Sequence, residues 1–282
     1  MKKIRFLLSF ILIGVLTTTA QVKTPQPSPL ATLKQVVGLT DFEVTYSRPS
    51  MNGREIFGGL VPYGKLWRTG ANRNTMITVS DNISIGGKPL AAGTYALFST
   101  PNKGEWTFYV YKNTENWGTP AEWKKDLIAA EFTAKPQKLN EVVESFTIDF
   151  NNFTPNSAYL VMSWENTALH IPVEVPTDKK VMATVEEAMK NPTPNDYFSA
   201  AVYFLQTDRD INKAKMWIDE AMKSREDKPF WMLRQQSLIY AKAGEKQTAI
   251  KLAKESLKGA EEAGNRDYIN MNKASLKEWG AL

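Results

Sequence analysis

Within residues 30–175 of this 282-residue chain, hydrophobic and polar side chains alternate in several short segments. Such alternation is the period of a strand with one buried face. It is strict in residues 42–46, 106–110 and 146–150. Further strands are predicted at residues 76–79, 83–85, 94–99, 127–133, 159–164 and 171–175. Because turns rich in glycine, proline and asparagine separate these segments, we predict an antiparallel β-sandwich or jelly-roll-like domain at residues 30–176.

The period becomes helical from residue 178 onward. Three apolar residues recur every four positions at Val181, Val185 and Met189. Prolines interrupt the pattern at residues 191–194. Residues 214–222 then align with residues 249–257 at a spacing of 35, close to the ~34-residue period of tetratricopeptide repeats. Residues 178–282 are therefore predicted to form an α-helical domain of tetratricopeptide-like repeats.

The two repeat units place small or apolar residues at equivalent positions, where paired helices must approach closely. The equivalent pairs are Ala214 with Ala249, Ile218 with Ala253, and Ala221 with Ser256. Two units and a capping helix at residues 268–279 fall short of the roughly three repeats that an independent array needs. This favours a helical layer that covers one side of the β domain. The alternative is a groove for a peptide or a partner protein.

The first twenty residues have the pattern of a secretory signal peptide. Lys2, Lys3 and Arg5 precede an apolar run at residues 6–16, and small residues follow it. That run is shorter than the roughly 20 apolar residues that cross a bilayer. We therefore predict a signal peptide at residues 1–20, a flexible proline-containing lead-in at residues 21–29, and an exported protein, periplasmic or secreted, without a membrane span after cleavage.

Composition excludes several classes of function. Without the predicted leader, the chain has 32 basic and 30 acidic residues. The basic residues form no stripe along the sequence, so nucleic-acid binding is not expected. The chain has no cysteine, which excludes disulfides, thiolate metal sites and a cysteine nucleophile. Its only histidine, His170, falls on the polar side of a predicted strand. We predict neither a metal site nor a cofactor.

An irregular stretch at residues 48–72 follows neither period. It holds three arginines and five glycines. Glycine lets the backbone turn sharply, and the planar guanidinium group suits anions. Loops on a rigid scaffold often form binding sites. The candidate ligand-binding residues in this stretch are Arg48, Arg54, Tyr63, Trp67, Arg68 and Asn72.

Each candidate has a structural alternative. Arg68 would otherwise hold loop carbonyl groups, and Asn72 would cap a turn. Trp117, with Tyr109 and Tyr111, would form a stacking platform for a sugar or aromatic group, or else would contact the helical domain. Trp117 completes the set of candidate ligand-binding residues.

Catalytic motifs are absent from the sequence. There is no Gly-x-Ser-x-Gly elbow, no His-Glu-x-x-His motif and no phosphate-binding loop. Glu55 is the one weak candidate for an acid or base, because it lies inside the irregular stretch. An ion pair between Arg54 and Glu55 that closes the loop is the preferred interpretation.

Several motifs occur together in the first domain. They are Tyr46-Ser-Arg-Pro49, Gly53-Arg54, Ile56-Phe-Gly58, Leu60-Val-Pro-Tyr-Gly-Lys65, Trp67-Arg-Thr-Gly-Ala-Asn72, Gly87-Lys88, Ala92-Gly-Thr-Tyr95 and Trp117-Gly118. With these motifs, residues 28–175 resemble the bacterial family called domain of unknown function 2911. The resemblance implies an exported protein, often with trailing helical repeats, and no assigned activity. Many relatives have an acidic residue directly after the Ala-Asn pair, where this chain has Arg73. A mechanism that needs a carboxylate at that position is therefore not expected for this chain.

The sequence leaves three hypotheses. The preferred one is an exported, non-catalytic binding module whose loop at residues 48–72 holds a small anionic or sugar-like ligand. Its helical domain would support the β domain or contact a protein. The second is a hydrolase of envelope glycans or esters that uses Glu55. In the third, the loop is purely structural and the protein is a scaffold.

Overall fold

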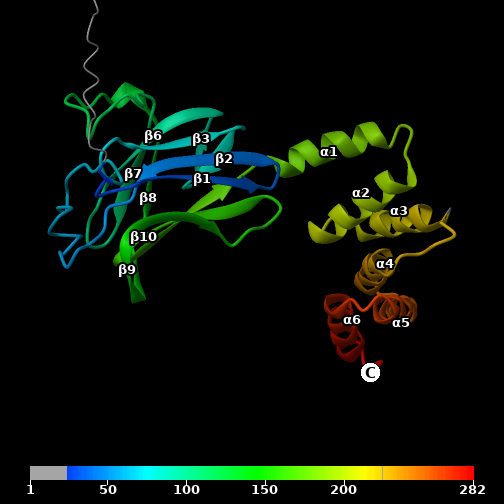
Figure 1. Cartoon of the computed structure of the whole chain (residues 1–282). Coiled ribbons are helices and arrows are strands. Elements are labelled where there is room, and N and C mark those ends of the chain that lie inside the picture. Colours follow the sequence, from blue (N-terminus) through cyan, green and yellow to red (C-terminus); the bar gives the residue numbers. More distant parts are fainter. Residues whose placement is uncertain (1–23, 224) are drawn as a thin grey trace, which may run out of the picture.

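A computed structural model describes residues 24–223 and 225–282 (Figure 1). In this part of the chain, ten strands form two antiparallel sheets, and six α-helices follow them. The predicted order of a β domain and then an α domain is therefore confirmed. The predicted signal peptide at residues 1–20 lies outside the described residues, as does the start of the lead-in at residues 21–29.

Six strands form the larger sheet. In spatial order they are β1 (Leu30–Val37), β2 (Thr40–Ser47), β3 (Thr75–Val79), β6 (Gly93–Thr100), β7 (Trp106–Tyr111) and β8 (Ile128–Ala134). A short 3-10 helix, η1 (Lys125–Leu127), precedes β8. Alternate residues of β2 and β7 are buried, as their strict alternation predicts.

Four strands form the smaller sheet. In spatial order they are β5 (Lys88–Leu90), β4 (Ile83–Ile85), β10 (Ser157–Glu174) and β9 (Gln137–Asn151). The two sheets share one core. Phe42 of β2 meets Phe150 of β9 with ring centroids 5.2 Å apart. The Tyr46 hydroxyl donates to the Ile148 carbonyl oxygen at 3.2 Å, so a buried hydrogen bond also joins the sheets.

Strand β10 differs from the prediction of two strands at residues 159–164 and 171–175. It is continuous, but its register against β9 shifts on both sides of Glu165. Glu165 has φ +54°, a conformation that interrupts the alternation of side chains without ending the strand. Strands β1 and β5 were not predicted, because apolar Leu30 and Val36 lie on the exposed face of β1 and break its alternation, and β5 has only three residues, one of them a proline.

The helices are α1 (Thr177–Ala188), α2 (Pro194–Gln206), α3 (Ile211–Lys223), α4 (Phe230–Lys242), α5 (Lys246–Glu262) and α6 (Arg266–Glu278). Helix α2 begins with a capping box, in which the Thr193 hydroxyl accepts from the Asp196 amide and the Asp196 carboxylate accepts from the Thr193 amide. Helix α2 packs on α3, and α4 packs on α5. No helix in the described residues has the length and apolar character of a membrane span.

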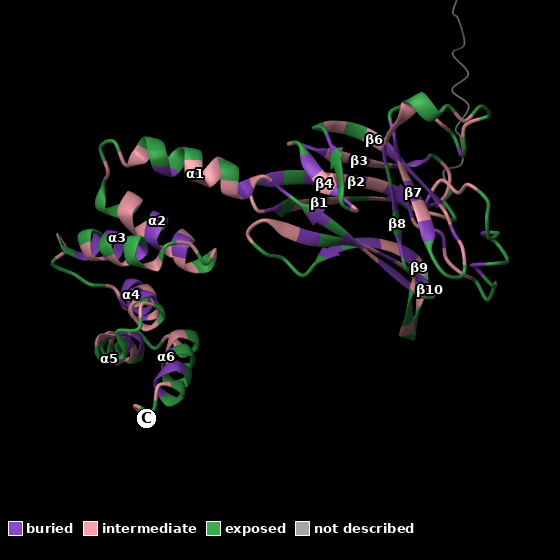
Figure 2. Cartoon of the chain, turned by 180° about the vertical axis from the view of Figure 1, so that it is seen from behind, coloured by how far each residue is buried: buried purple, intermediate pink, exposed green. Residues whose placement is uncertain are grey.

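The helices lie beyond one end of the sandwich, and α1 connects the two parts (Figures 1 and 2). The hydrogen bonds between them lie at the start of α1, where Thr177 Oγ1 accepts from the Leu39 amide at 3.2 Å. Asn156 Oδ1 accepts from the Asp178 amide at 2.9 Å. The preferred interpretation of the helices as a layer over one side of the β domain is therefore wrong.

Candidate ligand-binding site

The irregular stretch at residues 48–72 connects β2 to β3 and is fastened to both sheets. The Trp67 amide donates to the Ser99 carbonyl oxygen in β6 at 2.7 Å. The Met51 amide donates to the Glu144 carbonyl oxygen in β9 at 2.9 Å. The middle of the stretch enters the core, because Ile56 is fully buried. The stretch is therefore a rigid connection rather than an open loop.

Trp67 stands at the centre of an aromatic cluster. Its ring centroid lies 5.3 Å from that of Phe146 and 6.1 Å from that of Trp164. Its indole nitrogen donates to the Gly70 carbonyl oxygen at 3.0 Å. The side chain is half-buried, so one part packs on the core while another part lines a cavity.

This cavity has a volume of about 340 Å³ and is called the arginine cavity here. Its lining includes Ser50, Asn52, Arg54, Leu60, Trp67, Arg68 and Trp164. Among the described residues, no carboxylate lines it. Two guanidinium groups line the cavity, and the Glu144 carboxylate beside it accepts from the Asn52 amide at 2.9 Å, so the positive groups outnumber this acid and suit an anion.

Arg68 has hydrogen-bonding capacity that the described residues do not use. Its Nε is buried and has no hydrogen-bond partner among them. The guanidinium group lies against Gly118, where a Cβ would be only 2.9 Å from Arg68 Nη1. Reciprocal hydrogen bonds hold that segment in place, since Asn74 and Asn116 each donate a backbone amide to the other residue. Arg68 is thus positioned by its surroundings without being neutralised by them.

Arg54 is exposed and held by the main chain. Its Nε donates to the Met51 carbonyl oxygen at 2.8 Å, and its Nη2 donates to the Ser50 carbonyl oxygen at 2.6 Å. Within the described residues it forms no ion pair with Glu55, so the interpretation of an Arg54–Glu55 pair closing the loop is wrong. These two bonds use two of the five N–H donors of the guanidinium group, so the other donors are available to a ligand in the arginine cavity, which Arg54 lines.

Arg48 and Asn72 do not line the arginine cavity. Arg48 Nε donates to the Phe146 carbonyl oxygen at 3.1 Å, and its Nη2 donates to Thr147 Oγ1 at 2.8 Å. Asn72 has φ +58° and donates from its amide to the Ser28 carbonyl oxygen at 3.2 Å. Both side chains therefore fasten backbone segments to one another.

The structure places Tyr63 and Trp117 away from this cavity. Tyr63 is 37% exposed and lines a second cavity together with Trp106. Trp117 is 79% exposed and lines neither cavity. Tyr111 is buried and stacks on Trp123 with ring centroids 4.4 Å apart. The predicted stacking platform of Tyr109, Tyr111 and Trp117 is therefore wrong, because Tyr111 packs under its own loop.

No pair of carboxylates flanks either cavity in the part of the chain that is described. Glu55 is exposed and lines neither of them. The carboxylate of the nearby Glu165 is engaged in hydrogen bonds, which it accepts from the backbone amides of Ile56 at 3.4 Å and Phe57 at 3.5 Å. The described residues also contain no cluster of acids and histidine that would hold a metal ion.

Sequence reasoning missed several residues that line the arginine cavity. Ser50, Asn52 and Trp164 were not candidates. The Asn52-Gly53 pair is a turn signal, and both residues have positive φ. Trp164 comes from the smaller sheet, far along the chain, so no local pattern connects it to residues 48–72.

A family model described as a protein of unknown function (DUF2911) matches residues 28–173. The match covers more than half of the chain, so the chain belongs to this family, and the resemblance read from the motifs is confirmed for the β domain. No curated protein and no solved structure matches the chain. The family match ends one residue before the last strand does and extends to none of the α-helices α1–α6.

Proposed function

We propose that this member of the DUF2911 family is an exported binding protein without catalytic activity. Its ligand is small and carries a carboxylate or phosphate group, which the arginine cavity holds. The predicted signal peptide at residues 1–20 supports export to the periplasm or the medium. The unused, buried Nε of Arg68 beside a cavity without a carboxylate in its described lining is the observation that carries the proposal.

The energetics favour an anion at Arg68. A buried donor without a partner costs about 1–3 kcal/mol of stability. Because Nε itself is buried, an oxyanion in the cavity would meet Arg68 through the rest of its guanidinium group, by a charge-assisted hydrogen bond. Arg54 presents a second guanidinium group at the same cavity. The Ser50 and Asn52 side chains and the Trp67 and Trp164 rings would contact the uncharged part of the ligand, which agrees with a sugar-like body.

A hydrolase receives less support. Glu55 lies outside both cavities, and the Glu165 carboxylate is bonded to the backbone of the same loop. Glycosidases require two carboxylates, one on either side of the bound sugar. Glu55 and Glu165 do not provide this arrangement. The scaffold hypothesis explains Arg48 and Asn72 well, but it leaves the unpartnered Arg68 unexplained.

For the helical domain, we propose tetratricopeptide-like pairing of α2 with α3 and of α4 with α5. The equivalent positions of the two units support this, because Ala214, Ile218, Ala221, Ala249, Ala253 and Ser256 are all fully buried. A groove of about 590 Å³ is lined by α2, α4 and α6, with Leu205, Leu238 and Trp279 among its residues. Its position supports contact with a peptide or protein.

A thermal-unfolding titration tests the binding proposal. Inorganic phosphate and citrate are added to the chain from residue 21 onward, to Arg68→Ala and to the control Arg73→Ala. Arg73 is an exposed arginine that pairs with Glu115 and lies outside the cavity. A bound probe at a hundred times its Kd stabilises the fold by about 2.7 kcal/mol. The shift should persist in Arg73→Ala and disappear in Arg68→Ala. An equal shift in all three proteins, or no shift in wild type, would refute the proposal.

A further inference from the structure

A second cavity lies beside the same loop and shares no lining residue with the arginine cavity. It has a volume of about 290 Å³ and is called the tyrosine cavity here. We propose that it is a saccharide site for one acidic sugar unit, a uronate. This inference does not rest on the proposed function, because it concerns different residues and a different ligand.

Tyr63 supplies an exposed aromatic face to this cavity. Its ring lies against the backbone at Gly58, where a Cβ would be only 2.9 Å from Tyr63 Cε2. Gly58 has φ +106°, so both its backbone conformation and its missing side chain suit this position. Phe57 and Trp106 also line the cavity, and their rings pack edge to face with centroids 4.7 Å apart. Phe57 and Trp106 are buried, so the exposed ring of Tyr63 is the face that would stack on the C–H face of a pyranose ring.

Polar side chains from separate segments surround the aromatic residues. Asn166 and Thr167 follow the bulge at Glu165 in β10, and Asn102 comes from the turn between β6 and β7. Gln137 begins β9. Amide groups both donate and accept hydrogen bonds, which matches sugar hydroxyl groups. A purely anionic ligand would need no such mixture.

One residue fixes both sides of the cavity. Glu165 holds the loop through the amides of Ile56 and Phe57, and its positive φ directs the next two residues of β10. A hydrogen bond at 2.8 Å from the Gly64 amide to the Pro101 carbonyl oxygen ties the tyrosine segment to the turn that holds Asn102. The lining is therefore set by the fold, and bulges are common beside sites of this kind.

The charge of the lining selects an acidic sugar. Lys103 and Lys138 are exposed there and form no ion pair within the described residues. Lys138 lies opposite Thr167 in the β9–β10 pair, and both residues line the cavity. No carboxylate of the described residues lines the cavity. A uronate carboxylate would therefore meet two cations in the lining, while the Glu55 and Glu165 carboxylates lie beside the lining, next to Gly58 and Phe57.

Calorimetric titration with two matched sugars tests the inference. Methyl β-D-glucuronide carries the carboxylate, and methyl β-D-glucoside has a hydroxymethyl group in its place. Both are titrated into the chain from residue 21 onward, into Tyr63→Ala, Lys138→Ala and Arg68→Ala, and into the control Lys135→Ala. Lys135 is an exposed lysine near the cavity that does not line it. Thermal unfolding of each variant shows whether it is folded.

We expect wild type to bind the glucuronide about two- to fivefold more tightly than the glucoside, the size of one exposed ion pair. Lys138→Ala should remove most of this difference, Tyr63→Ala should weaken both sugars, and Lys135→Ala and Arg68→Ala should behave as wild type. Equal affinity for both sugars, no binding to either, or unchanged binding by a folded Lys138→Ala protein would each overturn the inference. Loss of glucuronide binding in Arg68→Ala would place the sugar in the arginine cavity instead, and so would overturn it too.

Discussion

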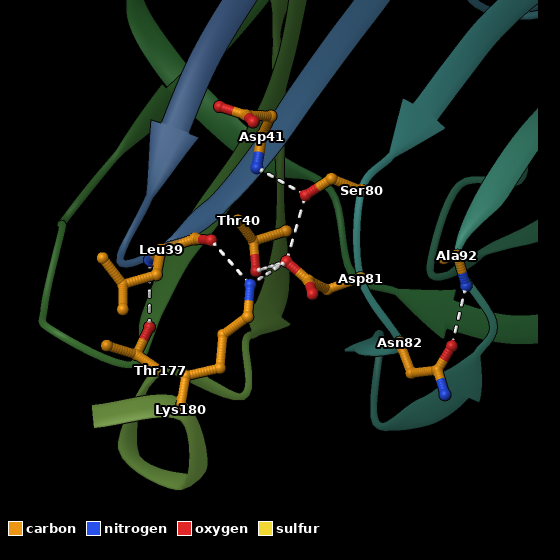
Figure 3. Close-up of polar contacts among 9 residues, drawn as sticks. All are labelled: Leu39, Thr40, Asp41, Ser80, Asp81, Asn82, Ala92, Thr177 and Lys180. Carbon is orange, nitrogen blue, oxygen red and sulfur yellow. Dashed lines mark hydrogen bonds and ion pairs between the residues drawn. The ribbon is translucent and has the colours of Figure 1, made fainter. Parts of the chain in front are cut away.

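Lys180 in α1 donates a hydrogen bond at 2.7 Å to the carboxylate of Asp81, in the turn between β3 and β4 (Figure 3). The same carboxylate accepts from the hydroxyl groups of Thr40 at 2.9 Å and Ser80 at 3.0 Å. Lys180 also donates to the Leu39 carbonyl oxygen at 3.0 Å. Lys180 and Asp81 thus connect the first helix to two turns of the sandwich.

Asp81→Asn should lower the stability of this junction. Lys180 holds the pKa of the Asp81 carboxyl below its usual value, and hydrogen bonds from Thr40 and Ser80 act in the same direction. Because the folded pKa is depressed, the contribution of this group is present above the unfolded pKa of about 3.9 and is lost as the pH falls through the folded pKa. The wild-type and Asp81→Asn unfolding temperatures should therefore differ by about 1–3 °C at pH 7, and the difference should shrink as the pH falls from about 4 through the depressed pKa of folded Asp81.

Asp126→Asn is the matched control for this measurement. Asp126 is exposed and forms no ion pair within the described residues. Its substitution should leave the unfolding temperature at pH 7 unchanged. If Asp81→Asn and Asp126→Asn have the same unfolding temperature at pH 7, the Lys180–Asp81 pair does not stabilise the junction.

Gly118→Ala should disturb Arg68 without touching the arginine cavity directly. Gly118 has φ +97°, which strains any other residue, and the added methyl group would meet Arg68 Nη1 at 2.9 Å. We expect a loss of about 1–2 kcal/mol in the free energy of unfolding and weaker phosphate binding. Gly104→Ala is the control, since a Cβ there meets nothing within 4 Å. Wild-type phosphate affinity in a folded Gly118→Ala protein would contradict the assigned position of Arg68 in the site.

Glu165→Ala should loosen the loop between the two cavities. The Ile56 and Phe57 amides would lose the carboxylate that accepts their hydrogen bonds. Their hydrogen-exchange rates, measured by NMR, should rise by about fivefold, which corresponds to ~1 kcal/mol of local stability. Glu165→Gln keeps an acceptor oxygen at the same place and should show a smaller increase. Identical exchange in wild type and Glu165→Ala would show that these long contacts do not hold the loop.

The sequence predicted the strands whose side chains alternate strictly, because a strand with one face in the core repeats every two residues. Trp106 and Phe108 are buried as that period requires, and Thr107 between them is not. The same rule failed at Glu165, since a bulge shifts the alternation while the strand continues. Tyr111 also departed from the rule, because the segment that holds Trp123 covers the outer face of β7.

The candidate site was predictable only in part. Composition alone marked residues 48–72, and Arg54, Trp67 and Arg68 do line one cavity. Composition could not show that Arg68 lines the cavity while Arg48 does not. Their roles differ because the fold brings different carbonyl oxygens near each guanidinium group. Arg48 meets the carbonyl group of Phe146 in β9, a residue 98 positions away in the chain. Contacts of this kind are set by the pairing of the sheets and leave no local sequence signal.

Ala253→Leu should destabilise the helical domain selectively. Ala253 is fully buried in α5, which packs on α4, so three extra carbon atoms would overfill a close helix contact. We expect a loss of about 1–3 kcal/mol from the unfolding transition of the helices. Phosphate binding should stay unchanged, because the arginine cavity lies in the β domain. Lys254→Leu places the same side chain at the next, exposed position and should cost little. Chemical denaturation followed by helical circular dichroism and by tryptophan fluorescence measures both variants, and equal stability of Ala253→Leu and Lys254→Leu would contradict the close pairing of α4 with α5.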